Sequence, residues 1–385
     1  MAGTPQFFKK LAHRVKLLSR LIRVGRVAWS GLFDRDQYRE NYPGLSALWK
    51  RFPICHYVLI GERMGYAPFE TFDPVSYADM YEDVADYPHG ALMHYIRHGH
   101  AESRFTQSPL DAAVYFEGAF PAVAPWPKSA RFAVVVHVFY LEVWDKFAAH
   151  LAAIELDLDV IVTLPDTPDF DHSADAIAQG PLRVAHVQRQ PNVGRDILAF
   201  LNLVNSGALS RYEAVCKLHT KKSPHLVDGD VWRQELLNGL LPMQGATKLA
   251  EAFVADPGAQ MLVPDPFLYR GDKWWSINKP VAEHLVEGMD LTLGHLELEF
   301  AAGSMFWLKP KLLEEIRSLG FRADQFVLER GQLDGTTAHA FERLTGILCA
   351  RTGGRIAVTS EMTGPVPQGQ SGRPSDFKMI TGSTR

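Results

Sequence analysis

Cysteine is scarce in this sequence of 385 residues. Only three cysteines are present, Cys55, Cys216 and Cys349, and they are widely spaced. An odd, sparse set argues against a disulfide framework and for a reducing compartment. No combination of Cys and His has the spacing of a structural zinc site. We therefore expect two or three domains, each held together by its own hydrophobic core.

Long apolar runs are also missing. No stretch of about 18 apolar residues is present, so no transmembrane helix is expected. Hydrophobic residues near the N-terminus alternate with cations, which is unlike the apolar segment of a secretory signal. These absences favour a cytoplasmic location.

Acidic residues are absent from residues 1–33, which carry seven cations: Lys9, Lys10, Arg14, Lys16, Arg20, Arg23 and Arg26. The whole chain has a net charge of −4, which leaves −11 on the remainder. That balance argues against a general nucleic-acid-binding surface. Residues 1–32 have helical periodicity, with one face formed by Leu11, Val15, Leu18 and Ile22. Such a basic amphipathic helix either lies on an anionic membrane surface or packs on its own protein.

A repeat follows in residues 33–120, where we predict a small all-α module. FDRDQYRENYPGL, from Phe33, matches FDPVSYADMYEDV, from Phe72, at a spacing of 39 residues. Asp34 and Asp73 are expected to cap the first helix of each copy. The module could bind a partner or an acceptor, and nothing in it indicates catalysis.

The second half of each copy repeats a His-Tyr pair. ICHYVLIGERMG matches LMHYIRHGHAES, which pairs His56 with His94 and Gly61 with Gly99. Each copy is expected to contain two helices, the second ended by its glycine. Both histidines are predicted to be packed and hydrogen-bonded rather than to act as ligands.

Alternating strands and helices indicate a second domain at 131–360. The proline-rich residues 121–130 are predicted to be a linker, and the Pro/Gly/Ser-rich residues 361–385 a flexible tail. Four strands are expected in RFAVVVHVFY, LDVIVTLP, LRVAHVQR and YEAVCKLH, with helical segments between them. This order predicts an α/β fold with a doubly wound, mostly parallel sheet. Ligands of such sheets bind at the carboxyl ends of the strands.

The fourth predicted strand runs into a cluster of cations. YEAVCKLHTKKS brings together five candidate phosphate-binding side chains, Lys217, His219, Lys221, Lys222 and Ser223. Cations at a strand end can stabilise a departing diphosphate. The alternative is that the lysines are ordinary solvated loop residues.

The turn after the third predicted strand adds further candidates. NVGRD opens a helix and contains Asn192, Gly194, Arg195 and Asp196. A helix N-terminus favours an anion, and arginine can hold a phosphate in a fork of two bonds. The alternative is an internal pair between Arg195 and Asp196 at an ordinary helix cap.

Five collinear motifs resemble the rhamnan synthesis protein F family: NVGRD, CKLHTKKS, WRQELLNGLL, EFAAGSMFWLKP and LDGTTAHAFERLTG. The resemblance covers residues 131–360 and implies a rhamnosyltransferase-type glycosyltransferase in bacterial surface-polysaccharide assembly. The helical repeat also resembles modules attached to such enzymes. A GT-A-like fold and a nucleotide-sugar donor, with dTDP-rhamnose as the candidate, follow from the resemblance.

The resemblance also exposes a difference. Where GT-A enzymes end their fourth strand in an Asp-x-Asp metal motif, this chain has Lys-Leu-His-Thr-Lys-Lys. We therefore predict no metal and a diphosphate neutralised by cations. Two Asp-x-Asp triplets occur elsewhere: Asp157-Leu-Asp159 is expected at the surface at the opposite end of the sheet, and Asp228-Gly-Asp230 is expected to cap a helix.

Candidates for catalysis and substrate binding come from the rest of the domain. Glu299 and Asp334 are the alternative general bases for an acceptor hydroxyl. Glu297 and Glu299 are expected to share one face of a single strand that runs into the Ala-Ala-Gly-Ser turn. Further substrate-binding candidates, at strand ends, in a tryptophan-rich loop and in that small-residue turn, are His137, Asp265, Trp274, Gly303 and Ser304.

The sequence therefore predicts a cytoplasmic glycosyltransferase, peripheral on the inner membrane. It would act on a glycan acceptor that is lipid-linked, with residues 1–32 on the anionic membrane. The alternative is a non-catalytic glycan-binding or assembly-scaffold protein that keeps a transferase-like sheet.

Overall fold

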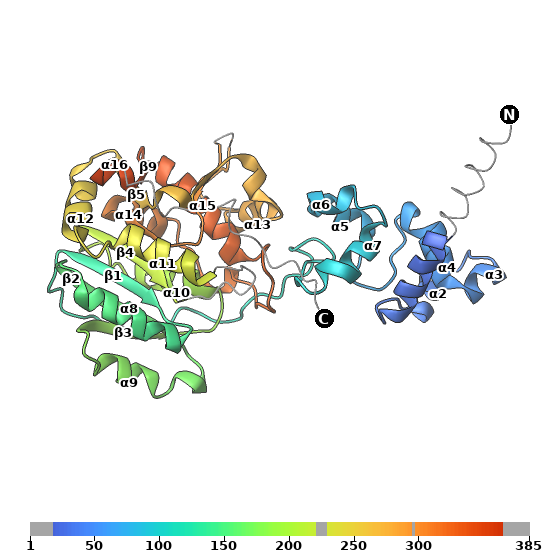
Figure 1. The fold of residues 1–385 in the computed structure, drawn as a ribbon, viewed down its shortest axis with the longest axis horizontal. Coiled ribbons are helices and arrows are strands. Elements are labelled where there is room, and N and C mark those ends of the chain that lie inside the picture. Colours follow the sequence, from blue (N-terminus) through green and yellow to red (C-terminus); the bar gives the residue numbers. More distant parts are fainter. Residues whose placement is uncertain (1–17, 221–228, 295–296, 365–385) are drawn as a thin grey trace, which may run out of the picture. The chain divides into compact units, whose positions relative to one another are not determined.

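The computed structural model describes residues 18–220, 229–294 and 297–364. The chain forms two compact units (Figure 1). One unit holds the residues up to 113 together with 330–335, and the other holds 114–329 and the residues from 336 onward. No helix within the described ranges is long and apolar enough to span a membrane.

The first unit is the helical repeat module. A helix over residues 18–29 precedes it. The first copy contains α2 (Arg35–Asn41), α3 (Ala47–Arg51), α4 (Pro53–Leu59) and η1 (Gly61–Met64). The second copy contains α5 (Pro74–Met80), α6 (Glu82–Ala85), α7 (Ala91–His94) and η2 (Tyr95–Gly99). Each copy therefore has four short helical segments rather than the predicted two.

The repeated capping residues lie where the sequence places them. The Asp34 carboxylate accepts hydrogen bonds from the N–H groups of residues 36 and 37 at the start of α2. Asp73 does the same for residues 75 and 76 at the start of α5. Both predicted caps are confirmed, and each satisfies backbone donors that the first helical turn leaves free.

The repeated histidine and glycine share one physical role. The Tyr38 hydroxyl lies 2.8 Å from His56 Nδ1, and the Tyr77 hydroxyl lies 3.1 Å from His94 Nδ1. A Cβ at Gly61 would overlap the Tyr38 hydroxyl, and a Cβ at the matching Gly99 would overlap that of Tyr77. Each copy thus keeps a buried tyrosine–histidine bond and the glycine that leaves room for it.

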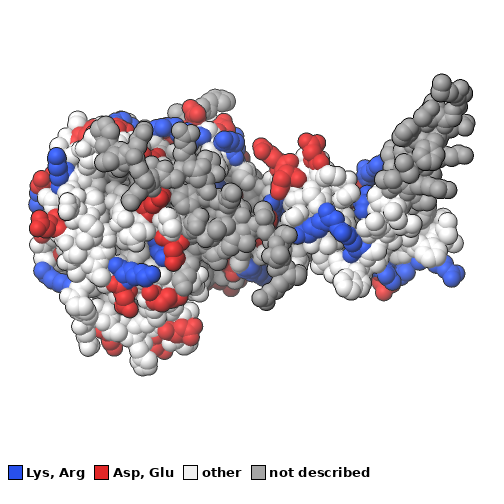
Figure 2. Space-filling model, viewed as in Figure 1, with Lys and Arg blue, Asp and Glu red and all other residues white. Residues whose placement is uncertain are grey.

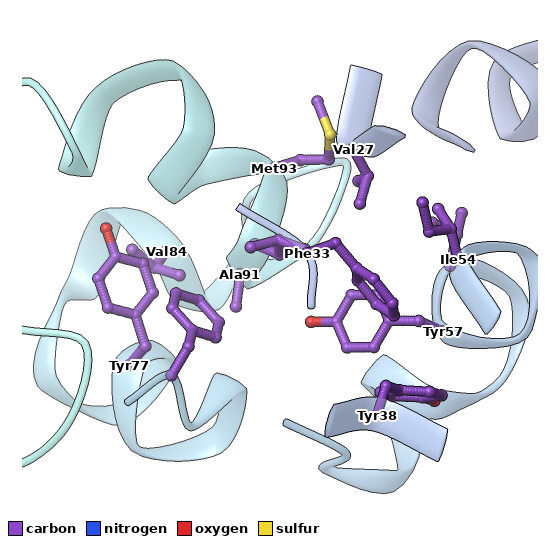
Figure 3. Close-up of a cluster of buried hydrophobic side chains, with 12 residues drawn as sticks. Val27, Phe33, Tyr38, Ile54, Tyr57, Tyr77, Val84, Ala91 and Met93 are labelled. Atoms are coloured by element: carbon purple, nitrogen blue, oxygen red, sulfur yellow. The ribbon is translucent and has the colours of Figure 1, made fainter. Parts of the chain in front are cut away.

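The two copies share one core. The buried side chains of the helix over residues 18–29 and of both copies form a single cluster, which includes Val27, Phe33, Tyr57, Tyr77 and Met93 (Figure 3). Phe33 packs on Tyr57 with ring centroids 5.6 Å apart. Burial of these aromatic side chains is the main stabilising contribution available to so small a unit.

We predict that Gly61→Ala destabilises the module by about 1–3 kcal/mol, because the added methyl group forces the Tyr38 hydroxyl away from its histidine. Gly44→Ala is the matched control, since nothing lies within 4 Å of its position. Urea denaturation followed by circular dichroism measures both.

In a Tyr38→Phe background the hydroxyl is gone, so the loss caused by Gly61→Ala should shrink. An equal loss in both backgrounds would show that the glycine does not serve the tyrosine–histidine bond.

The second unit is built on a seven-stranded sheet with the strand order β3-β2-β1-β4-β8-β5-β9. Its strands are β1 (Phe132–His137), β2 (Leu158–Pro165), β3 (Val184–Gln190), β4 (Ala214–His219), β5 (Ala259–Val263), β8 (Phe306–Leu308) and β9 (Arg355–Val358). All neighbours are parallel except β8, which runs antiparallel to β4 and β5. The predicted α/β class with a mostly parallel sheet is confirmed.

Helices cover both faces of the sheet (Figure 1). On one face, α10 (Arg195–Asn205), α14 (Pro310–Ser318) and α15 (Thr337–Arg351) pack on one another. On the other face lie α8 (Leu141–Ala153), α11 (Gly229–Leu240) and α12 (Ala246–Ala255). The indole of Trp307 on β8 donates to the Leu240 carbonyl of α11, and His150 of α8 bonds the Leu241 carbonyl. Two helices, α9 (Ser173–Ala178) and α13 (Asn278–Leu285), lie at the margins.

Three sequence predictions about the second unit need correction. Asp265 was expected at a strand end, but β5 ends at Val263 and Asp265 begins the 3-10 helix η4 (Asp265–Phe267). The stretch predicted as one strand with Glu297 and Glu299 is broken into β7 (Glu299–Ala301) and β8, because the backbone turns sharply at Gly303. β7 pairs with β6 (Leu268–Arg270) in a separate two-stranded sheet.

The third correction concerns residues 121–130, which have no helix or strand but pack on the sheet domain. The Trp126 indole is buried, donates to the Tyr212 hydroxyl and stacks on His186. These residues therefore cover the edge of the domain. At the other end, α16 (Thr359–Thr363) runs past the predicted start of the tail, and residues 365–385 lie outside the described residues.

Candidate functional site

The carboxyl ends of β1 and β4 lie side by side where the strand order reverses. His137 and His219, the last residues of these strands, are register partners. The Thr220 N–H donates to the His137 carbonyl, and the Thr220 hydroxyl accepts from the N–H groups of Phe139 and Tyr140. Thr220 thus ties the two chain segments together at the place where doubly wound sheets bind ligands.

Lys217 is the centre of this region. Its side chain is 1% exposed and is enclosed beneath the carboxyl end of β4. The ammonium pairs with the Asp196 carboxylate and donates to the Ser304 carbonyl at 2.8 Å and to the Ser304 hydroxyl at 2.9 Å. All three N–H bonds of the ammonium therefore have acceptors, and β4, α10 and the turn before β8 are held at one point.

Two other titratable groups share this environment. Burial alone would raise the pKa of the Asp196 carboxyl, but the Lys217 ammonium, with His219 and His137 nearby, holds that pKa well below its usual range. Burial lowers the pKa of His137 from 6.5 to about 4, with the cations opposing its protonation and Asp196 favouring it. His137 is therefore neutral at neutral pH, and its Nδ1 lies 2.9 Å from the Thr163 hydroxyl.

Both turns beside Lys217 have unusual backbone conformations. Gly194 and Arg195 have φ of +66° and +53°, and Gly303 and Ser304 have φ of +87° and +54°. A non-glycine residue at positive φ costs about 1–3 kcal/mol and is retained where the surroundings hold it in place. The partners of Lys217 belong to or follow these turns, so the buried ion pair holds the strained backbone.

Gly194 also has no room for a side chain. A Cβ there would lie 2.6 Å from Leu198 Cβ and 2.6 Å from a ring carbon of Phe326. Two constraints therefore restrict this position to glycine: its positive φ and the lack of space for a Cβ. The turn starts α10, whose first N–H groups form a favourable site for an anion.

Arg195 does not pair with Asp196, the alternative that the sequence left open. Its Nε donates to Glu329 at 3.0 Å, and its Nη1 lies 2.8 Å from His339 Nε2. The Thr336 hydroxyl lies 2.9 Å from Nδ1 of the same histidine. Arg195 is therefore bound to the start of α15, and its side chain is partly exposed.

The start of α15 also reaches the second strained turn. The Glu342 carboxylate accepts from the Gly303 N–H at 2.9 Å, and the Gly303 carbonyl lies 2.8 Å from His219 Nε2. Arg343 donates to the Trp274 carbonyl at 2.6 Å. The first turns of α15 thus support three loops: the one before α10, the one before β8 and the tryptophan-rich loop.

The structure brings together half of the predicted site residues. His137, Asp196, Lys217, His219, Gly303 and Ser304 form one cluster, with Gly194 and Arg195 beside it. Asn192 is exposed in the turn before α10. Lys221, Lys222 and Ser223, which follow Thr220 directly, lie outside the described residues.

Lys217 does not have the role that the sequence suggested. It was predicted to bind phosphate, but its three donors are engaged and its side chain is enclosed. The structure instead makes it a residue that positions the site. His219, also buried, is bonded to the backbone at Gly303.

For Asp265, Glu299 and Trp274, the structure gives contacts with residues outside this cluster. Asp265 accepts from Thr359 and Ser360 at the start of α16. Glu299 pairs with the exposed Arg270 on β6. Trp274 is partly exposed and lies over Tyr269, with ring centroids 4.3 Å apart. Asp334 belongs to residues 330–335, which group with the helical module.

The two Asp-x-Asp triplets have different outcomes. Asp159 was expected at the surface but is buried, where it accepts from the Ser129 N–H at 2.9 Å and the Tyr212 hydroxyl at 2.8 Å. Asp230 lies in the first turn of α11 and pairs with Arg233. Within the described part of the chain, no group of three or more His, Cys, Asp or Glu side chains is arranged to hold a metal.

Four residues of the site were missed from the sequence: Thr220, Glu329, His339 and Glu342. Thr220 lies within the CKLHTKKS motif, and His339 and Glu342 lie within LDGTTAHAFERLTG. These two motifs were recognised. The hydrogen-bond partners of Thr220, however, lie 80 or more residues away in the sequence, and that of Glu342 lies 39 residues away. No local pattern could have revealed these contacts.

Replacing Lys217 with methionine should destabilise the protein by about 3–5 kcal/mol, because it leaves the Asp196 carboxylate buried without a cation. Lys309→Met is the matched control. Lys309 is also buried, but it donates to the backbone carbonyls of Val254 and Asp256, so its loss leaves only neutral acceptors. Urea denaturation measures both, and equal losses would contradict a special role for the ion pair.

His137 should make the protein less stable as the pH falls. Its pKa is about 4 in the folded state and 6.5 ordinarily, so the unfolded state binds more protons between these values. Stability is therefore complete above pH 6.5 and falls towards pH 4, by up to about 1.4 kcal/mol per pH unit from this group.

Urea denaturation at several pH values tests this contribution. His137→Gln should flatten the decline relative to the unchanged protein. A His137→Gln slope equal to that of the unchanged protein would contradict the assignment.

Comparison with known proteins identifies a family. Residues 119–353 match the family described as rhamnan synthesis protein F, which confirms the resemblance drawn from the five motifs. Two relatives, each described as uncharacterized protein WxcX, come from two strains of Xanthomonas campestris pv. campestris. They are 32% identical over 263 residues, which cover 68% of this chain and 38% of each relative.

The chain therefore matches 38% of the length of these relatives. Among solved structures, the mannosyltransferase PcManGT from Pyrobaculum calidifontis, in complex with GDP-Man and Mn2+, aligns with a TM-score of 0.33. The alignment has 17% identity and covers 61% of this chain and 58% of that chain. This likeness is too distant to define the fold.

Proposed function

The chain belongs to the rhamnan synthesis protein F family, and on that basis we propose that it is a glycosyltransferase. It moves a sugar from a nucleotide-sugar donor to a growing bacterial surface polysaccharide. The observation that carries the proposal is the convergence of three family motifs at one point of the sheet. NVGRD, CKLHTKKS and the Ala-Ala-Gly-Ser turn meet at the carboxyl ends of β1 and β4.

The donor's diphosphate occupies the edge formed by these turns. The first N–H groups of α10, which begins at Arg195, favour an anion there. Lys221 and Lys222 follow Thr220 directly in the sequence and supply the countercharge. The buried Lys217–Asp196 pair keeps the two turns in place, so the site is organised before the donor binds.

Donor binding proceeds without a metal in this proposal. The cations after β4 take the position that a metal motif has in other transferases, and they stabilise the leaving diphosphate by charge. Because dTDP-rhamnose is the donor that the family's name suggests, it is the first candidate.

The transfer itself needs a base for the acceptor. The acceptor hydroxyl attacks the anomeric carbon, the bond from that carbon to the diphosphate breaks, and the nucleoside diphosphate leaves. In this proposal Glu299 takes the proton of the hydroxyl. Glu299 suits this role because its partner, Arg270, is exposed and can exchange it for water. Trp274 supplies a partly exposed apolar face for a sugar ring.

A lipid-linked acceptor places the enzyme at the cytoplasmic face of the inner membrane. The basic residues 1–32 support attachment to anionic lipid. Nothing in the proposed transfer step depends on this attachment.

Calorimetric titration with dTDP-rhamnose, UDP-sugars and GDP-sugars, with and without EDTA, tests the proposal. We expect one donor to bind equally in both conditions. Lys221→Ala with Lys222→Ala should weaken that binding by about tenfold or more for each lysine, since each loses a charge-assisted hydrogen bond.

Lys248→Ala with Lys311→Ala is the matched control, because both lysines are exposed and lie in the first turns of α12 and α14. This pair should bind the donor normally. Failure of every donor to bind the folded protein would favour the non-catalytic scaffold, and binding lost in EDTA would refute metal independence.

A further inference from the structure

Large apolar side chains that face solvent gather in the first part of the helical module. Eight of them lie within residues 18–64: Leu18, Leu21, Ile22, Trp29, Leu48, Phe52, Ile60 and Met64. In the second copy of the repeat, Val75 alone is of this kind among the described residues. Scattered exposed apolar residues need no explanation, but a gathering on one part of a small unit indicates an interaction surface.

The helix over residues 18–29 has two distinct faces. On the inner face Val27 is buried in the module's core, and Arg23 pairs with Glu62 at 2.6 Å. Leu18, Ile22 and Trp29 share the opposite face, being spaced by four and seven residues. Trp29 is 95% exposed and Leu18 59% exposed. The helix thus packs on its own protein through one side and leaves an apolar stripe on the other.

The first copy of the repeat also exposes large apolar side chains to solvent. Phe52, between α3 and α4, is 48% exposed, and Met64, at the end of η1, is 60% exposed. The glycine and histidine register pairs Ile60 with His98 and Met64 with Glu102 in the second copy. The core positions are therefore the same in both copies, whereas these surface positions are apolar in the first copy and polar in the second.

The two copies also differ in their acidic residues, which are fewer in this part of the first copy. Residues 43–61 contain no Asp or Glu and carry Lys50 and Arg51, both of which are exposed. Residues 82–99 of the second copy contain the acids Glu82, Asp83 and Asp86. Figure 2 shows acidic atoms over α5 and α6 and basic atoms beside α3.

Glu62, the acidic residue directly after residues 43–61, already has interaction partners. Glu62 pairs with Arg23 and accepts the Leu92 N–H at 3.0 Å. Burial raises the pKa of Glu62, which the arginine and these hydrogen bonds oppose. Residues 43–61 therefore present Lys50 and Arg51 with no acid in the same segment, and the nearby Asp36 carboxylate is paired with Arg39 at 2.5 Å.

We propose that this side of the module docks on an anionic phospholipid bilayer. The docking surface comprises the eight exposed apolar side chains together with Lys50 and Arg51. Apolar groups of this kind enter the boundary between head groups and acyl chains, and tryptophan prefers that depth. The cations contact lipid phosphates, each strengthening partition by about fivefold at moderate salt.

The second copy is polar at the two positions that match Ile60 and Met64. This inference gives the proposed peripheral location a defined surface. It does not rest on the transfer reaction, because vesicle binding and donor binding are measured separately.

Flotation of the full chain with vesicles tests the proposal. Binding should be strong to vesicles of phosphatidylcholine with phosphatidylglycerol, weak to phosphatidylcholine alone, and reduced by high salt. Lys50→Glu with Arg51→Glu should lower the partition coefficient by at least about 25-fold, as two cations become acids. Phe52→Ser with Met64→Gln should lower it by about tenfold or more.

Two controls test whether the docking surface itself contacts the bilayer. Met243→Gln, at an exposed apolar residue of the sheet domain, should leave vesicle binding unchanged. Trp29 fluorescence should shift to the blue on adding anionic vesicles, and the shift should disappear in Trp29→Phe. Circular dichroism confirms that each variant remains folded.

Two results would overturn the proposal. If all folded variants bind vesicles as the unchanged chain does, the docking surface plays no part in membrane binding. If the chain ignores vesicles and the same substitutions abolish self-association seen by light scattering, the surface joins two copies and the bilayer assignment is wrong.

Discussion

A single buried ion pair, between the Lys217 ammonium and the Asp196 carboxylate, organises the sheet domain's candidate site. Removing two charges from water is costly, and such a pair is retained only where the remaining hydrogen-bonding capacity is satisfied. Here the remaining donors of the ammonium go to Ser304, through its carbonyl and its hydroxyl. Three chain segments that are distant in sequence therefore have to meet in one arrangement. Both positive-φ turns of the site adjoin this point, so the free energy that their backbone costs is offset by the pair and its surroundings.

The start of α15 supports the same region from a second direction. His339 contacts Arg195, and Glu342 holds the Gly303 N–H. A rigid helix thus positions residues that loops present, as a preorganised site requires. This arrangement explains why the family motifs are spread over the whole domain: four of the five contribute a side chain or a turn to a shared point. Within the described residues, the buried side chains shape the site, and Asn192 in the turn before α10 is exposed.

Features with a local cause could be predicted from the sequence. The apolar runs of β1 and β4 and the alternation of strands and helices predicted the mostly parallel sheet, and the paired Tyr and His of the repeat predicted a hydrogen-bonded core. Features set by distant partners could not. Lys217 looks like a surface cation in CKLHTKKS, because its partners are 21 and 87 residues away. The break between β7 and β8 depends on a turn that Glu342 stabilises from another helix, and Asp265 looks like a site residue until its contact with α16 is seen.

The most direct test of the account is a crystal structure of the protein with a nucleoside diphosphate bound, with dTDP, UDP and GDP soaked in turn. The account predicts that the diphosphate lies at the carboxyl ends of β1 and β4, against the start of α10 and the residues after Thr220, with the Lys217–Asp196 pair intact beneath it. A nucleotide bound elsewhere on the domain, or no nucleotide bound at saturating concentration, would contradict it.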